Sequence, residues 1–255
     1  MKRSSTYYDS LVILLTGTIT PNSKTTLSVK DPKIRLTQYM EALQFYIEKT
    51  KSRIVFVENS GTDFNVFPKI TDRIEYLSFK SPPEKIERGK GFKELQIIEY
   101  ALNNSEFIKN ADAIIKITGR LKVLNINQII IQFLRLRSKS KNLVYADPFA
   151  FGNMDARCFV FTLDFWTFLK DAGVNINVHH NFELTLWDAI SNYIEKDQHK
   201  FKAIKVPLRI QGVSGSFGNE YDHNLFVHYA RYIRKITEGF FNSKNLEKSI
   251  TKRNS

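Results

Sequence analysis

Short apolar segments alternate with longer amphipathic segments along the first half of the chain. The apolar runs have the length and β-branched content of buried strands, and turn residues bound them. They cover residues 11–15, 53–57, 74–79, 113–117, 142–145 and 157–163. Three of the early runs lead through a turn into a helical pattern, and a repeated strand, turn and helix is typical of a mostly parallel sheet.

Helices are predicted where apolar residues recur at three- and four-residue spacing. Asp31 followed by Pro32 is typical of an N-cap with proline at the first helical position. Gly89-Lys90-Gly91 introduces a second helix. The predicted helical segments run from 31 to 49, after 91, and over 126–136, 164–171, 183–194 and 222–241. These elements predict an α/β chain with one main domain.

Charge and cysteine content narrow the function classes. The 255 residues carry 38 Lys and Arg against 26 Asp and Glu, a formal net charge of +12. Such an excess favours a polyanionic partner: nucleic acid, an anionic membrane surface or a phosphorylated small substrate. The single Cys158 excludes an intramolecular disulfide framework. With no apolar stretch near the length of a spanning helix, we expect a cytoplasmic protein.

Small polar residues follow three of the predicted strands. They form Thr16-Gly17-Thr18, Glu58-Asn59-Ser60-Gly61 and Thr118-Gly119-Arg120. In an open α/β sheet, ligands bind beyond the carboxyl ends of the strands. Glycine admits a ligand close to the backbone, and arginine offers a planar fork for phosphate. Each motif alone is equally typical of an ordinary turn, so the prediction of a binding site rests on the three together.

Several side chains in the second half could carry chemistry. Glu183 could accept a proton from a hydroxyl, or it could simply complement the positive end of a helix. Asp155 and Arg157 would share one face of a strand. His180 could bind phosphate or could be structural. The loop 212–218 could present backbone N–H groups to an anion, or it could be an ordinary surface loop.

Taken in order, these motifs resemble a group of bacterial capsule and lipopolysaccharide glycosyltransferases with a GT-A-like, Rossmann-related domain that binds a nucleotide sugar. The resemblance spans residues 11–221. The residues that carry it are Leu15 to Ile19, Asp31, Arg35, Tyr39, Val57 to Ser60, Gly89 to Gly91, Glu94, Lys116 to Arg120, Asn153 to Arg157, Glu183 and Gly212 to Ser216.

The resemblance implies that different parts of the domain bind the donor and the acceptor. Residues 1–146 would bind the nucleotide, residues 147–243 would form an acceptor-side region, and 244–255 would be a basic tail. The donor-binding residues would be Thr16, Gly17, Asp31, Arg35, Glu58, Asn59, Ser60, Lys90, Lys116, Thr118, Gly119 and Arg120. The acceptor-binding residues would be Arg157, His180, Ser214 and Ser216. Glu183 would be the catalytic base, with Asp155 as the second candidate.

The sequence leaves open whether the protein requires a metal ion. The sequence has no Asp-x-Asp motif, and Lys116 and Arg120 stand where enzymes of this group usually place metal-binding carboxylates. Direct neutralisation of the diphosphate by cationic side chains is therefore expected. We assign no metal ligand, and Mg²⁺ or Mn²⁺ is left as an open cofactor.

The sequence thus predicts a glycosyltransferase that moves a sugar from a nucleotide-sugar donor to a glycan or lipid-linked glycan in cell-surface polysaccharide biosynthesis. We expect inversion with a carboxylate base, although spacing alone leaves retention open. The tail 244–255 is either solvated or an anchor to the inner membrane face. The alternative is a non-enzymatic basic nucleic-acid-binding protein. Against it, the aromatic residues lie in apolar periodic runs, so we expect no nucleic-acid partner.

Overall fold

The computed structural model describes residues 10–21, 27–63, 71–83, 87–150, 152–214, 218–221 and 225–237. Two sequence predictions lie outside these residues: Ser216 as an acceptor-binding residue, and the basic tail 244–255.

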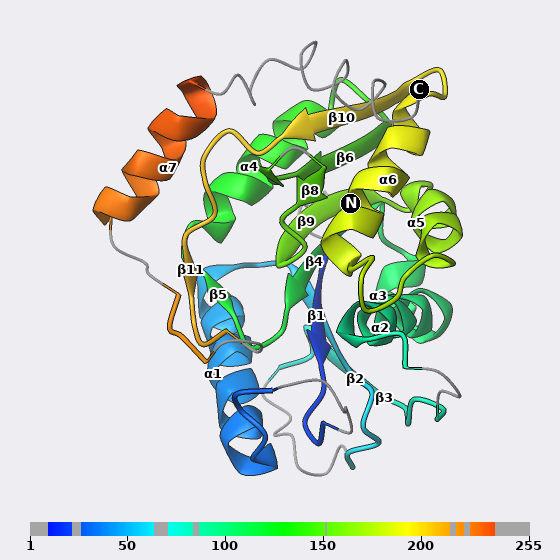
Figure 1. Cartoon of the computed structure of the whole chain (residues 1–255), viewed down its shortest axis with the longest axis vertical. Helices are drawn as coiled ribbons and strands as arrows, with labels where there is room; N and C mark the ends of the chain where they lie inside the picture. The colour runs from blue at the N-terminus through cyan, green and yellow to red at the C-terminus, as the bar shows by residue number, and fades with distance from the viewer. Residues whose placement is uncertain are drawn as a thin grey trace, which may run out of the picture.

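A seven-stranded sheet forms the centre of the molecule (Figure 1). Its order is β10-β6-β9-β4-β1-β2-β3, and all neighbours are parallel except β9, which runs antiparallel to β4 and β6. The strands are β1 (Leu11–Gly17), β2 (Arg53–Glu58), β3 (Ile74–Ser78), β4 (Ala113–Thr118), β6 (Asn142–Ala146), β9 (Cys158–Thr162) and β10 (His199–Ala203). The predicted α/β class with a mostly parallel sheet is confirmed.

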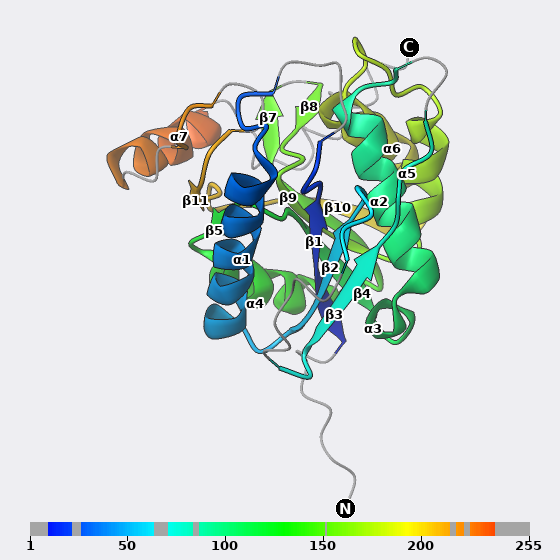
Figure 2. The same cartoon turned by 90° about the horizontal axis from the view of Figure 1, so that it is seen from below.

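Helices cover both faces of this sheet (Figures 1 and 2). The helices of the structure are α1 (Pro32–Lys49), α2 (Lys90–Asn104), α3 (Glu106–Lys109), α4 (Ile126–Arg137), α5 (Phe165–Gly173), α6 (Phe182–Ile194) and α7 (Leu225–Thr237), and α7 lies outside the layers that cover the sheet. Buried side chains of α1 and α4 pack on one face, and those of α2, α5 and α6 pack on the other. Successive residues of β1 alternate between these two cores, with Val12 and Leu14 in one and Ile13 and Leu15 in the other. Burial on both faces explains why this strand is a continuous apolar run.

Two short ribbons complete the sheet structure. One pairs β5 (Lys122–Val123) with β11 (Ile210–Gln211), and the other pairs β7 (Pro148–Ala150) with β8 (Asn153–Met154). The ribbon of β5 and β11 brings the segment after Ile210 beside the segment after β4. This placement lets Val213 and Tyr221 reach the same rim of the sheet as Arg120.

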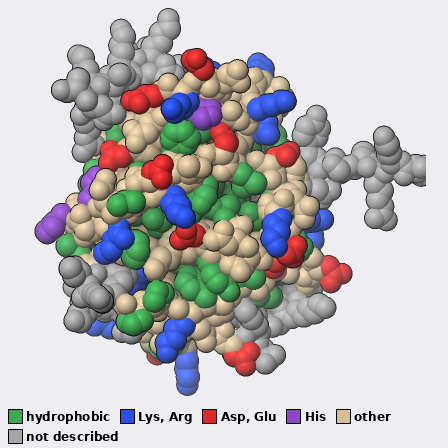
Figure 3. All heavy atoms as spheres, turned by 90° about the vertical axis from the view of Figure 1, so that its right-hand side faces the viewer, with side chains coloured by type: hydrophobic (Ala, Val, Ile, Leu, Met, Phe, Trp, Pro, Cys, Tyr) green, Lys and Arg blue, Asp and Glu red, His purple; other side chains and the backbone are tan. Residues whose placement is uncertain are grey.

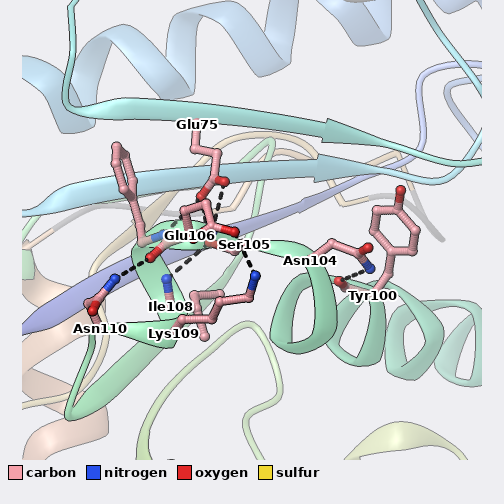
Figure 4. A network of polar contacts seen from close by, with 9 residues as sticks. Glu75, Tyr100, Asn104, Ser105, Glu106, Ile108, Lys109 and Asn110 are labelled. Atoms are coloured by element: carbon pink, nitrogen blue, oxygen red, sulfur yellow. Dashed lines mark hydrogen bonds and ion pairs between the residues drawn. The ribbon is translucent and has the colours of Figure 1, made fainter.

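A side-chain cap fixes the start of α1 as the sequence predicts. The Asp31 carboxylate accepts a hydrogen bond from the backbone N–H of Lys33 at 2.8 Å at the start of α1. At the corner between α2 and α3, Glu75 of β3 accepts hydrogen bonds from the Ser105 hydroxyl and from the backbone N–H groups of Glu106 and Phe107 (Figure 4). This corner lies at the amino end of β4, so the network anchors α2 far from its own N-terminus.

Several elements were not predicted: the edge strand β10, the one-turn helix α3 and the short strands β5, β7, β8 and β11. The strand β10 was not predicted, because its sequence His-Lys-Phe-Lys-Ala lacks the apolar run of the central strands; as an edge strand it pairs only with β6. The last helix covers 225–237, inside the predicted 222–241, whose ends are outside the described residues. Within the described ranges, no helix has both the length and the apolar character needed to cross a bilayer.

Candidate active site

A cavity of about 580 Å³ opens where β1 and β4 end and where α2 and α6 begin. Its walls come from segments far apart in the sequence: the ends of both strands, the first turns of both helices, α1, and the loop before α7. The residues that line it are Thr16, Gly17, Thr18, Pro21, Leu27, Arg35, Tyr39, Gly89, Lys90, Gly91, Lys93, Glu94, Ile97, Thr118, Arg120, Leu121, Arg157, Asn177, Val178, Asn181, Phe182, Glu183, Val213 and Tyr221. This is the position in which open α/β sheets bind ligands.

Tight backbone contacts join the strand ends below the cavity. The backbone N–H of Asn59 donates to the carbonyl of Gly17 at 3.2 Å, and that of Gly119 donates to the carbonyl of Thr16 at 2.9 Å. A Cβ at position 119 would lie 2.7 Å from the Thr16 oxygen, and one at position 17 would lie 2.9 Å from the Phe56 ring. Glycine is therefore required here by strand packing.

Arg35 and Tyr39 hold the loop that follows β1. The Arg35 Nε donates to the carbonyl of Thr18 at 2.6 Å, and its Nη2 lies 3.2 Å from the Tyr39 hydroxyl. That hydroxyl accepts the backbone N–H of Thr18 at 2.8 Å. The two side chains lie one helical turn apart on α1, so they share one face of the helix. They position the loop and leave the guanidinium in the cavity wall.

Positive charge dominates the cavity. Five of its lining residues are basic and two are acidic, an excess of three positive charges. The basic residues are Arg35, Lys90, Lys93, Arg120 and Arg157, and the acidic ones are Glu94 and Glu183. Burial lowers the pKa of Lys90, and the charges of Arg35 and Arg120 lower it further. A bound anion would relieve this repulsion, so the cavity is built for a negatively charged ligand.

Two helix N-termini point their positive ends at the same cavity. The N-cap of α2 is Gly89, which has a φ of +86° and no side chain to cap the first turn. Asn181 caps α6, where its Oδ1 accepts from the backbone N–H of Leu184 at 3.0 Å. A Cβ on Gly91 would lie 2.9 Å from the backbone nitrogen of Phe182, so the helix starts are in close contact. Converging N-termini favour anions.

Glu183 lies in the first turn of α6 and in the cavity wall. Burial raises the pKa of its carboxyl above the ordinary value of 4.5. The charges of Glu94 and Asp155 act in the same direction, while its own backbone hydrogen bond and Lys116 oppose the rise. A carboxyl with a raised pKa at the edge of a cationic cavity can take a proton from a hydroxyl near neutral pH.

Lys116 lies beneath the cavity floor and is fully buried. It pairs with Glu94 and donates to the carbonyl of Ala156 at 2.6 Å. The Thr16 hydroxyl also donates to Glu94, at 3.1 Å. This ion pair connects β4 to α2 and neutralises Glu94, so Lys116 supports the cavity from below.

Asp155 is buried beside the cavity and holds Arg157 in its wall. The Nε of Arg157 lies 2.8 Å from one carboxylate oxygen, and its Nη2 lies 2.5 Å from the other. The guanidinium carbon lies 4.7 Å from the centre of the Tyr221 ring. Burial alone would lower the pKa of Arg157, but the Asp155 and Tyr221 contacts outweigh it and the pKa is raised. Arg157 therefore stays charged in the cavity wall.

The structure gathers eight of the predicted site residues into the cavity lining. They are Thr16, Gly17, Arg35, Lys90, Thr118, Arg120, Arg157 and Glu183. Four more support the lining directly through the contacts described above: Asn59, Lys116, Gly119 and Asp155. The remaining predicted residues within the described ranges lie off the lining: Asp31, Glu58, Ser60, His180 and Ser214.

The residues off the lining have structural contacts of their own. Glu58 is fully buried, and its carboxylate accepts from the Ser60 and Thr62 backbone N–H groups and from the Ser78 hydroxyl. The Nε2 of His180, which precedes α6, lies 3.0 Å from the Oδ2 of Asp188 on α6. The Ser214 carbonyl accepts from the Ser28 hydroxyl at 3.0 Å. These contacts order the surrounding loops.

Sequence reasoning assigned no site role to several lining residues. Tyr39 and Glu94 were among the residues of the family resemblance, and their helical spacing from Arg35 and Lys90 could have placed both in the wall. Lys93 follows from the same spacing on α2. Tyr221 gives no such signal, because only the pairing of β5 with β11 brings its segment to the cavity.

The donor set of the cavity does not suit a divalent cation. Among the described residues, no group of three or more His, Cys, Asp or Glu side chains is placed to hold a metal ion. Of the two lining carboxylates, Glu94 is bound by Lys116 and Thr16. A divalent ion prefers several unengaged oxygen ligands, and here it would have to displace Lys116.

The structure of this chain is similar to several solved structures. No protein-family model matches the sequence, and no curated protein matches it. The chain is similar to the solved structure of a glycosyltransferase involved in the glycosylation of the major capsid of PBCV-1. The identity is 14%, the coverage is 77% of this chain and 82% of that one, and the TM-score is 0.47.

Two further solved structures are similar at comparable levels. One is a provisionally assigned nucleotide-diphospho-sugar transferase from Desulfovibrio desulfuricans G20, at 10% identity, with 76% and 79% of the two chains covered and a TM-score of 0.49. The other is a cytidylyltransferase from Leptospira borgpetersenii serovar Hardjo-bovis (strain JB197), at 12% identity, with 76% and 75% covered and a TM-score of 0.44. Similarity at this level does not indicate a function, so the function has to be inferred from the chemistry of the cavity.

Proposed function

We propose that this protein is a glycosyltransferase that moves a sugar from a nucleoside-diphosphate donor to a hydroxyl of a glycan acceptor. The observation that carries the proposal is the cavity's excess of three positive charges at the carboxyl ends of parallel strands, with one carboxyl of raised pKa at its edge. A diphosphate needs the cations, and an attacking hydroxyl needs the carboxylate.

The cations would act on the leaving group. As the bond between the sugar carbon and the diphosphate oxygen breaks, its electron pair stays on that oxygen and negative charge develops there. Lys90, Arg120 and the first turn of α2 lie in the cavity wall where they can stabilise this charge. Because the donor set does not suit a divalent ion, the side chains themselves would supply the positive charge.

Glu183 would act as the base. Its ionised carboxylate would take the proton of the acceptor hydroxyl while the hydroxyl oxygen bonds to the sugar carbon. Asp155 is held by Arg157 in a bidentate pair, which favours Glu183 over Asp155 for this role. One base of this kind suits transfer with inversion.

The proposed acceptor and its location rest on the ordered motifs of the sequence. They support an acceptor in capsule or lipopolysaccharide biosynthesis, carried on a lipid at the inner membrane face. The net charge of +12 agrees with an enzyme that works close to an anionic surface. Binding of the nucleotide by residues 1–146 and of the acceptor by residues 147–243 belongs to the same proposal.

A nucleic-acid-binding role is less well supported. Such a role needs basic side chains gathered on one exposed face. On the face formed by α2, α5 and α6, Lys and Arg side chains are interspersed with Asp and Glu (Figure 3). In the cavity, by contrast, basic residues outnumber acidic ones by five to two, which suits a small anion.

A donor screen tests the proposal. The full chain is incubated with a panel of nucleotide sugars, and release of nucleoside diphosphate is measured with and without lipid-linked glycans. We expect one donor to give acceptor-stimulated release. Release of pyrophosphate from a nucleoside triphosphate and a sugar phosphate would instead identify a nucleotidyltransferase. Salt-sensitive binding of any oligonucleotide, with no effect of nucleotides, would overturn the enzyme assignment.

A further inference from the structure

Helix α7 exposes an apolar face. The side chains of Phe226, Tyr229, Ile233 and Ile236 are 83%, 61%, 59% and 52% exposed. A globular protein tolerates scattered apolar side chains on its surface, but several on one short helix indicate an interaction surface. In both views of the molecule, α7 lies outside the layers that cover the sheet (Figures 1 and 2).

The spacing of these residues places them on one side of the helix. At about 100° per residue, positions 226, 229, 233 and 236 fall within a sector of about 80°. Positions 231, 234 and 235, which are Arg, Arg and Lys, fall outside this sector. The helix contains no acidic residue. An apolar face on a helix whose charged residues are all basic is typical of helices that lie in the interface of an anionic membrane.

We propose that α7 docks the protein on an anionic phospholipid bilayer, with its apolar side chains among the acyl chains and its basic residues at the headgroups. Thirteen residues make a helix about 20 Å long, too short to cross the bilayer, so it would lie in the membrane plane. A second copy of the chain suits this surface less well. Pairing two α7 helices by a twofold axis would leave every basic residue of the pair without an acidic partner on the other helix, because the helix contains no acidic residue.

The position of α7 in the chain gives the docking a consequence for catalysis. Tyr221 lines the cavity, and α7 begins four residues later at Leu225. Four residues span at most about 14 Å, so the start of α7 must lie close to the cavity wall. Docking would therefore hold the cavity near the bilayer surface, where a lipid-linked acceptor resides. This last step rests on the proposed function, whereas the membrane binding does not.

Vesicle co-sedimentation without any substrate tests the docking. The full chain is mixed with vesicles of phosphatidylcholine alone or with added phosphatidylglycerol. The test variant combines Phe226→Ser with Ile233→Ser. The matched control combines Ile34→Ser on α1 with Val174→Ser at the end of α5, which are 51% and 74% exposed in the wild type. Equal melting temperatures would show that all three proteins are folded.

We expect wild type and control to bind the anionic vesicles alike and the neutral ones weakly. The test variant should bind anionic vesicles at least about tenfold more weakly, because two large apolar side chains no longer leave water. Equal binding by the test variant, or no binding by the wild type, would overturn the proposal. So would a wild-type dimer that the test variant alone dissociates. Donor turnover is measured separately, so its failure would leave the docking result intact.

Discussion

Glu183 shows how one residue's surroundings could decide the chemistry of the site. The same carboxyl on an exposed first turn would only complement the helix dipole. Here it is largely buried in a cavity wall, close to Glu94 and Asp155, and its pKa is raised. The sequence left both interpretations open, because burial at residue 183 depends on the contact between the starts of α2 and α6.

Replacing Glu183 tests its role as base. Glu183→Gln should lower kcat by about 10²- to 10⁴-fold, the usual contribution of a general base. In the wild type, kcat should fall as the pH drops through the raised pKa of Glu183, because the protonated carboxyl cannot accept a proton. Glu195→Gln, an exposed change at the other end of α6, is the matched control and should leave the rate unchanged. Equal rates for both variants would remove Glu183 from this role.

The same substitution should have the opposite effect on stability: it should stabilise the fold while it lowers the rate. A carboxyl whose pKa is raised on folding destabilises the folded state progressively as the pH rises from its ordinary pKa through the raised pKa, and the loss is complete above the raised pKa. Glu183→Gln should therefore melt at a higher temperature than the wild type near neutral pH, and the difference should vanish below pH 4.5, the ordinary value. A lower melting temperature at neutral pH would mean that the ionised carboxylate is structurally required.

At the scale of elements, the ion pair between Lys116 and Glu94 joins the central strand β4 to α2. Lys116→Met should lower the free energy of unfolding by about 3 kcal/mol, because it leaves a largely buried carboxylate without its cation. Adding Glu94→Met should restore most of that loss, since an apolar pair of similar size carries no desolvation cost. Denaturant unfolding measures both. If the single variant were as stable as the wild type, the pair would not be what holds these elements together.

Parallel strand topology explains how much of the site could be predicted from the sequence. The strand ends converge as this topology requires, so Gly17, Thr118 and Arg120 could be placed at one rim. The sequence could not show that Glu58 lies off the cavity lining, because the N–H and O–H donors that satisfy its carboxylate come together only in the fold. Lys116 was expected at the donor, but the alternation of β4 turns it toward the core beneath Glu94. Tyr221 needed the long-range pairing of β5 with β11.

At the scale of the whole molecule, the proposed function has the positive side chains of the cavity supply the charge that a divalent cation would otherwise provide. Turnover should therefore be unchanged after exhaustive treatment with a chelator. Loss of turnover that added Mn²⁺ or Mg²⁺ restores would show that a metal carries the leaving-group charge. In that case Glu94 would have to release Lys116 to act as a ligand.

The central claim is that the cavity binds a nucleoside diphosphate through its positive charges, and calorimetric titration tests it most directly. A panel of nucleoside diphosphates is titrated into the wild type, into Lys90→Met, and into Lys109→Met on the distant helix α3 as the matched control. We predict that one diphosphate binds, that Lys90→Met raises its Kd about tenfold for the lost charge-assisted contact, and that Lys109→Met leaves the Kd unchanged. Absence of binding by every diphosphate, or equal Kd values for the two variants, would contradict the account.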